Sequence, residues 1–116
     1  MNARDAGVRI TVLAVPDCPN APVVRERIAA AIEGHAASVE FVEVSDEATA
    51  AWWHMTGSPT LLLGGVDPFA LPGADPSLSC RLYRHADGTT DGAPSVADLR
   101  RVLAASGRDP YLISAP

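Results

Sequence analysis

Hydrophobic residues follow two different periods between residue 8 and residue 106 of this chain. Short, largely apolar runs rich in β-branched residues are typical of buried strands, whereas apolar residues three or four positions apart indicate a helix with one buried face. The pattern predicts strands at Val8–Val15, Val39–Val44, Thr60–Leu63 and Leu78–Arg84. It predicts helices at Val23–Ile32, Glu47–Met55 and Val96–Ser106. The order is therefore β-α-β-α-β-β-α.

This order predicts an α/β fold with one four-stranded mixed sheet and helices on both faces. The first two strands flank a helix, and such a β-α-β unit makes parallel strands with a right-handed crossover. The last two strands are joined without a helix, so we expect Thr60–Leu63 and Leu78–Arg84 to pair antiparallel. The proline-rich segment between them, 66–79, is long for a structureless connection, and such loops are usually functional or mobile.

The chain of 116 residues is long enough for one domain. We expect a flexible N-terminus at 1–7, the domain at 8–107 and a C-terminal tail at 108–116. The first residues lack the apolar core of a secretory signal, and no stretch approaches the ~18 apolar residues of a membrane span. The net charge of −5 disfavours nucleic acid as a partner. These features predict a cytoplasmic protein with neither a nucleic-acid nor a membrane partner.

Cys18 occupies the junction between the first predicted strand and the first predicted helix, in Val-Pro-Asp-Cys-Pro-Asn-Ala. The positive potential at a helix N-terminus favours the thiolate, which is the reactive form of cysteine. Either Pro19 or Asn20 is expected to cap the helix. The functional interpretation is an activated thiol; the alternative is a small buried apolar residue, which is the usual fate of a free cysteine.

Two short segments, together with the order of elements, resemble the thioredoxin-like fold over about residues 8–106. They are Cys18-Pro19-Asn20-Ala21 and Gly57-Ser58-Pro59-Thr60. The resemblance implies a cis peptide bond before Pro59, with this proline facing Cys18. It also implies a substrate held by Pro19, Asn20, Ser58, Pro59 and Thr60. Thioredoxins have a second cysteine where this chain has Ala21, so the similarity is to single-cysteine members, in which a dithiol cycle within the motif is impossible.

A narrower resemblance is to small bacterial thioredoxin-like proteins often described as alkylmercury lyase-like. It is carried by Cys-Pro-Asn-Ala-Pro at 18–22, by the Gly-Ser-Pro-Thr segment, and by Val66-Asp67-Pro68-Phe69, Ser79-Cys80-Arg81-Leu82-Tyr83 and Ala93-Pro94-Ser95. Organomercurial lyases use two cysteines and an acidic residue. Cys18 and Cys80 would correspond to the two thiols, but no acid stands at the matching position near Cys18.

The expected topology argues against a pair formed by Cys18 and Cys80. If Leu78–Arg84 runs antiparallel to Thr60–Leu63, Cys80 lies ~13 Å from the sheet end that holds Cys18. A disulfide requires Cα atoms within ~7 Å of each other. We therefore expect Cys80 to be structural, with a role as second thiol as the alternative.

Three functions are compatible with these features. The first is a monothiol thiol-disulfide oxidoreductase that acts through Cys18, with a small-molecule thiol or a partner protein supplying the second sulfur. The second is the handling of an organomercurial or a soft metal by Cys18 and Cys80, since thiolates select soft metals. The third is a non-catalytic binding module, because a fold does not imply a function.

The sequence contains no phosphate-binding glycine motif and no zinc-type Cys/His spacing, so we expect no cofactor and no metal site. His54 is interpreted as a surface residue rather than a base or ligand.

Overall fold

The structure is a computed structural model that describes residues 7–107. It is an α/β protein with three helices and several short sheets within that range. The helices are α1 (Ala21–Ala31), α2 (Glu47–Trp53) and α3 (Val96–Gly107). The strands are β1 (Val8–Ala14), β2 (Ala37–Glu43), β3 (Thr56–Ser58), β4 (Thr60–Leu63), β5 (Ser77–Cys80), β6 (Tyr83–Arg84) and β7 (Thr90–Asp91). The expected tail at 108–116 and all but the last residue of the expected N-terminal segment lie outside the described residues.

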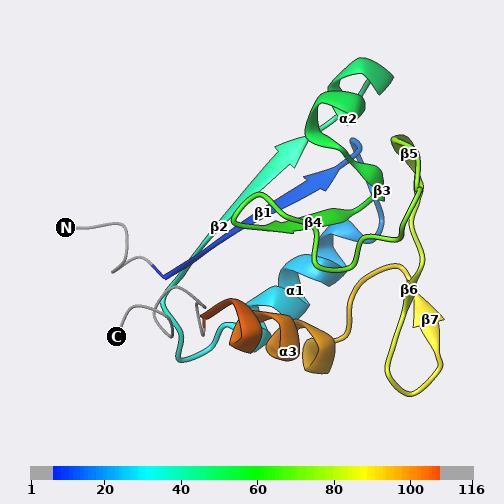
Figure 1. The fold of residues 1–116 in the computed structure, drawn as a ribbon. Helices are drawn as coiled ribbons and strands as arrows, with labels where there is room; N and C mark the ends of the chain where they lie inside the picture. Colours follow the sequence, from blue (N-terminus) through cyan, green and yellow to red (C-terminus); the bar gives the residue numbers. More distant parts are fainter. Residues whose placement is uncertain (1–6, 108–116) are drawn as a thin grey trace.

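The main sheet has three strands in the order β2-β1-β4. β1 and β2 are parallel, as expected for strands joined by a helix, and β4 is antiparallel to β1. Helices cover both faces of this sheet: α1 and α3 lie on one side and α2 lies on the other (Figure 1). The predicted helices on both faces are therefore confirmed.

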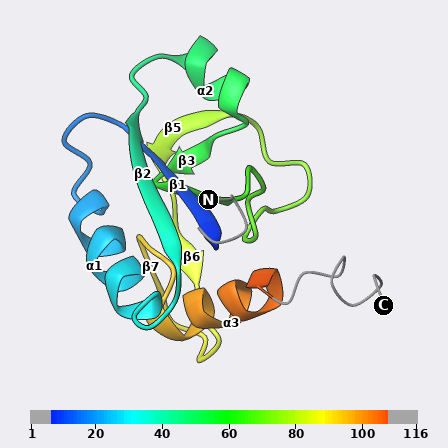
Figure 2. The ribbon, with the colours of Figure 1, turned by 90° about the vertical axis from the view of Figure 1, so that its left-hand side faces the viewer.

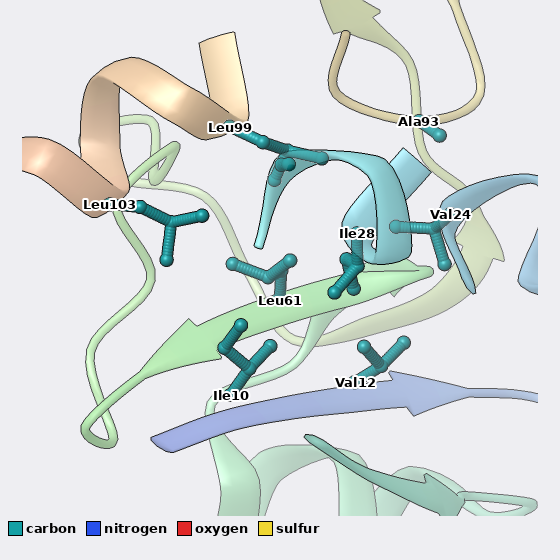
Figure 3. Packing of buried hydrophobic residues seen from close by; sticks show 9 residues of the cluster. Ile10, Val12, Val24, Ile28, Leu61, Ala93, Leu99 and Leu103 are labelled. Atoms are coloured by element: carbon teal, nitrogen blue, oxygen red, sulfur yellow. The ribbon is translucent and has the colours of Figure 1, made fainter. Parts of the chain in front are cut away.

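The alternation of side chains along the strands produces two separate cores. Ile10 and Val12 of β1 point to the face covered by α1 and α3, where Leu61, Leu99 and Leu103 complete the larger cluster (Figure 3). The next residue of β1, Leu13, and Leu62 of β4 instead face α2 in the smaller cluster. The central strands are thus buried on both sides, which explains why their sequences are almost continuously apolar.

The prediction of a fourth strand in the main sheet is wrong. The segment expected to pair with Thr60–Leu63 is interrupted after Cys80, and its first part, β5, pairs in parallel with β3. The physical reason is Arg81, whose side chain is 8% exposed and turns inward to bind polar groups around β3 and the following loop. The second part, β6, forms an antiparallel hairpin with β7 around Asp87 and Gly88.

Candidate functional site

Cys18 lies in a tight turn between β1 and α1. Its N–H donates to the Val15 carbonyl at 3.2 Å, and its own carbonyl accepts from the Ala21 N–H at 3.1 Å. Asn20 is the N-cap of α1, as one of the two predictions had it, although its side chain makes no capping hydrogen bond. Cys18 therefore precedes the helix N-cap by two residues and lies near the positive end of α1, outside its first turn.

An open cavity of about 330 Å³ adjoins Cys18. One wall is the turn itself with the start of α1, and the opposite wall is the end of β2. The lining residues are Ala14, Val15, Pro16, Asp17, Cys18, Ala21, Pro22, Phe41, Val42 and Glu43. The Cys18 residue is only 6% exposed, and it is one of the residues that line this cavity.

The turn that precedes β4 lies beside the Cys18 turn. The Ser58–Pro59 peptide bond is cis, as the resemblance implied. The Val15 N–H donates to the Ser58 hydroxyl oxygen at 3.0 Å, so one residue, Val15, is hydrogen-bonded to both turns. The Thr60 hydroxyl donates to the Gly57 carbonyl at 2.6 Å and closes the second turn from within.

Burial changes the interpretation of the expected substrate-binding residues. Ser58, Pro59 and Thr60 are all less than 2% exposed, so they offer no surface to a substrate in this conformation. Pro19 is exposed and Asn20 is half-buried against Gly92. The structure therefore places Cys18 and the cis proline in neighbouring turns, but it leaves only the Cys18 side open.

A buried ion pair holds the long loop against the cis-proline turn. The Arg81 guanidinium donates to the Asp67 carboxylate at 2.8 Å and to the Phe69 carbonyl at 2.7 Å. It also lies over the Tyr83 ring, 4.5 Å from its centroid, while the Tyr83 hydroxyl donates to the Pro59 carbonyl at 2.6 Å. Phe69 packs edge-on against Tyr83 and anchors the loop on the core. Four residues from two of the segments quoted for the narrower resemblance, Asp67, Phe69, Arg81 and Tyr83, thus form one structural cluster.

Cys80 occupies a different place from the one the sequence suggested. The expected distance of ~13 Å between Cys80 and the sheet end that holds Cys18 depended on an antiparallel strand. In the structure β5 is parallel to β3, and Cys80 stands in register with Ser58. Cys80 is exposed and lines a separate cavity of about 220 Å³ with Leu71 and Leu82. Cys18 and Cys80 therefore line two different cavities.

The walls supplied by β2 are the part of the site that sequence reasoning missed. The carboxyl ends of parallel neighbours meet at the same edge of a sheet, so the end of β2 belongs beside the Cys18 turn. That topological signal was present in the predicted β-α-β unit. Within residues 7–107 no cluster of histidine, cysteine, aspartate and glutamate has the geometry of a metal site. His54 is exposed at the end of α2, in agreement with its interpretation as a surface residue.

A second charged cluster joins the β6–β7 hairpin to α1 and α3. The Arg27 guanidinium donates to both carboxylate oxygens of Asp91, at 3.2 and 2.9 Å. The His85 Nε2 lies 2.9 Å from the same carboxylate, and its Nδ1 lies 3.8 Å from a carboxylate oxygen of Asp98. Hydrogen bonds from Arg27 hold the pKa of Asp91 well below its usual range, and Arg101 lowers the pKa of Asp98.

These lowered pKa values predict that acid destabilises the fold. A carboxyl group whose pKa is lower in the folded than in the unfolded state stabilises the fold above its unfolded pKa of about 4, and this contribution is lost as the pH falls further. We expect the free energy of unfolding, measured by urea titration at a series of pH values, to fall below about pH 4. Asp91→Asn should make that decline shallower, whereas Asp75→Asn in the exposed loop should leave it unchanged. An unaltered slope in the Asp91 variant would contradict the assignment.

Comparison of the chain with protein-family models, with characterised proteins and with solved structures finds no match. Among the helices of the described residues, none combines the length and apolarity needed to cross a bilayer.

Proposed function

We propose that this protein is a thioredoxin-like monothiol protein that acts in thiol-disulfide exchange through Cys18. The observation that carries the proposal is the cavity beside Cys18, which lies between the start of α1 and the end of β2. The β2-β1-β4 order with its antiparallel third strand and the cis bond before Pro59 support a thioredoxin-like origin. The missing antiparallel fourth strand marks a departure from that fold. The cytoplasmic location stays a prediction.

The chemistry requires one thiolate in the protein and a disulfide outside it. The Cys18 sulfur attacks one sulfur of the substrate, a new Cys18–substrate disulfide forms, and the other half of the substrate leaves as a thiolate with the electron pair of the broken bond. An external thiol then attacks the mixed disulfide and releases Cys18. No electron donor beyond that thiol is needed, because each step exchanges one S–S bond for another.

The organomercurial or soft-metal function has less support, because it requires Cys18 and Cys80 to bind one ligand together. They line separate cavities, of about 330 Å³ and about 220 Å³. The binding-module function remains the second candidate, and the low exposure of Cys18 favours it. Cys18→Ser discriminates between thiol exchange and the binding module, since a module that does not use the thiol binds its partner unchanged.

The direct test is formation of a mixed disulfide at each cysteine. The Cys80→Ser chain, which retains only Cys18, and the Cys18→Ser chain, which retains only the exposed Cys80, are each incubated with 2,2′-dithiodipyridine. The release of 2-thiopyridone gives the rate and mass spectrometry gives the adduct. We expect Cys18 to form the adduct in the folded Cys80→Ser chain despite its burial, because it lines an open cavity. A folded Cys80→Ser chain that forms no adduct would overturn the proposal.

A further inference from the structure

The accessible approach to Cys18 runs along β2. Ser58, Pro59 and Thr60 are buried, so the cis-proline side of the thiol is closed. The cavity that adjoins Cys18 has Phe41, Val42 and Glu43 as its far wall, and these are the last residues of β2. Any group that reaches the sulfur through this cavity therefore passes the end of that strand.

β2 is an edge strand, and within residues 7–107 it pairs only with β1. Figure 2 shows it running in front of β1, between α1 and α2. The Ala36 carbonyl accepts from the Val8 N–H, and the Val44 N–H donates to the Ala14 carbonyl. The backbone N–H and C=O groups of the even-numbered residues of β2 therefore point toward β1. Because backbone groups alternate along a strand, the N–H and C=O groups of Val39, Phe41 and Glu43 point to the open side. This edge can accept a further extended chain.

The rim of the cavity is acidic. Asp17 and Glu43 are both exposed and both line it, and no basic side chain is among the lining residues. Glu40 adds a further exposed carboxylate on β2. The Arg25 guanidinium lies 3.9 Å from the Phe41 ring centroid, but Arg25 is not among the lining residues. The edge and the cavity therefore complement a positively charged partner.

We propose that the open edge of β2 is the docking surface of an extended, basic, cysteine-containing polypeptide, whose cysteine sulfur is delivered to Cys18. This inference rests on the proposed function, because it names the class of substrate for the same thiol. The polypeptide adds a strand to β2, its cationic side chains face Asp17 and Glu43, and its disulfide is the bond that Cys18 breaks. Glutathione disulfide, which is anionic and has no extended strand to pair, is a poor fit to the same surface.

The test compares activated peptides on the Cys80→Ser chain. The probe is Lys-Val-Cys-Val-Arg with its cysteine sulfur joined to 2-thiopyridine, so that attack by Cys18 forms the protein–peptide disulfide and releases 2-thiopyridone. One control peptide carries glutamate in place of lysine and arginine. The other keeps the basic side chains but is N-methylated at alternate positions, which removes donors needed for strand pairing.

We expect the basic peptide to react on the order of tenfold faster than the acidic one at low ionic strength, with the difference shrinking as salt is added. N-methylation should slow the basic peptide by about fivefold, which corresponds to the loss of one net backbone hydrogen bond. Glu43→Gln should slow it by about threefold, as expected for one solvent-exposed charge pair. The matched control Glu33→Gln, at an exposed position outside the cavity, should not.

The outcomes separate this inference from the proposed function. If Cys18 reacts with 2,2′-dithiodipyridine but treats all three peptides alike, the docking inference is wrong and thiol exchange stands. If the N-methylated basic peptide reacts as fast as the unmethylated one, the docking inference is also wrong, because strand pairing then contributes nothing to the rate. If Cys18 reacts with neither the small reagent nor any peptide, the proposed function fails first.

Discussion

Replacing Arg81 by methionine is expected to lower the free energy of unfolding by about 3–5 kcal/mol, because it leaves a buried carboxylate without its cation. The Arg81 and Asp67 side chains are 8% and 10% exposed, and their charged atoms are 2.8 Å apart. The same substitution removes the hydrogen bonds that the guanidinium donates to the Phe69 carbonyl and the Thr56 hydroxyl. Urea unfolding at neutral pH measures the loss.

Two further variants show whether the buried charge is the cause. Arg84→Met, at an exposed position, should change the free energy of unfolding by less than about 0.5 kcal/mol. Combining Arg81→Met with Asp67→Leu removes both charges, and the double variant should be more stable than Arg81→Met alone. The expected loss is about 3–5 kcal/mol. If the free energy of unfolding of Arg81→Met instead lies within about 1 kcal/mol of that of the unchanged protein, the ion pair does not hold the loop.

Gly57→Ala is expected to cost about 3 kcal/mol, from backbone strain and steric overlap together. Gly57 has φ +125°, a conformation that side chains with a Cβ rarely adopt. A Cβ there would lie 2.8 Å from the Cβ of Arg81 and 3.2 Å from the Ser79 carbonyl oxygen. Since β5 packs against this glycine, the strand would have to move away from β3. The free energy of unfolding and the 2-thiopyridone release rate of Cys18 are the two measurements.

Gly64→Ala is the matched control for the strain alone. Gly64 also has a positive φ, of +57°, but a Cβ there would meet no atom within 4 Å. This variant should cost about 1 kcal/mol, the ordinary penalty for a left-handed residue with a side chain. Equal costs at the two glycines would mean that close packing of β5 against Gly57 contributes nothing to stability.

The sequence was informative where local pattern and tertiary contacts agree. The strands of the main sheet and the three helices were predicted because their apolar periods match the faces that are buried, and the loop at 66–79 was predicted from its prolines. The strand at 78–84 was predicted from its composition. An arginine in such a strand is expected to face outward, whereas the Arg81 side chain turns inward. No local pattern reveals that its guanidinium has buried acceptors around Thr56, Asp67 and Phe69.

The candidate site was predicted only in part. The junction that holds Cys18 and the turn that holds Pro59 could both be recognised from short motifs, and the structure places the two turns side by side. Burial of Pro59 could not be predicted, because it depends on Tyr83 and the loop folding over the turn. The cavity walls formed by Phe41 and Glu43, by contrast, follow from the predicted β-α-β unit, because the carboxyl ends of parallel strands meet at one edge of the sheet.

The ion pair between Arg81 and Asp67 has a consequence for the motions of this protein. Arg81 joins the loop to the turn at Ser58, and Ser58 accepts a hydrogen bond from Val15, the residue that also holds the Cys18 turn. Segments coupled in this way tend to open together as one cooperative unit. We therefore expect the exposure of Cys18 and the local unfolding of the loop at 66–79 to change together.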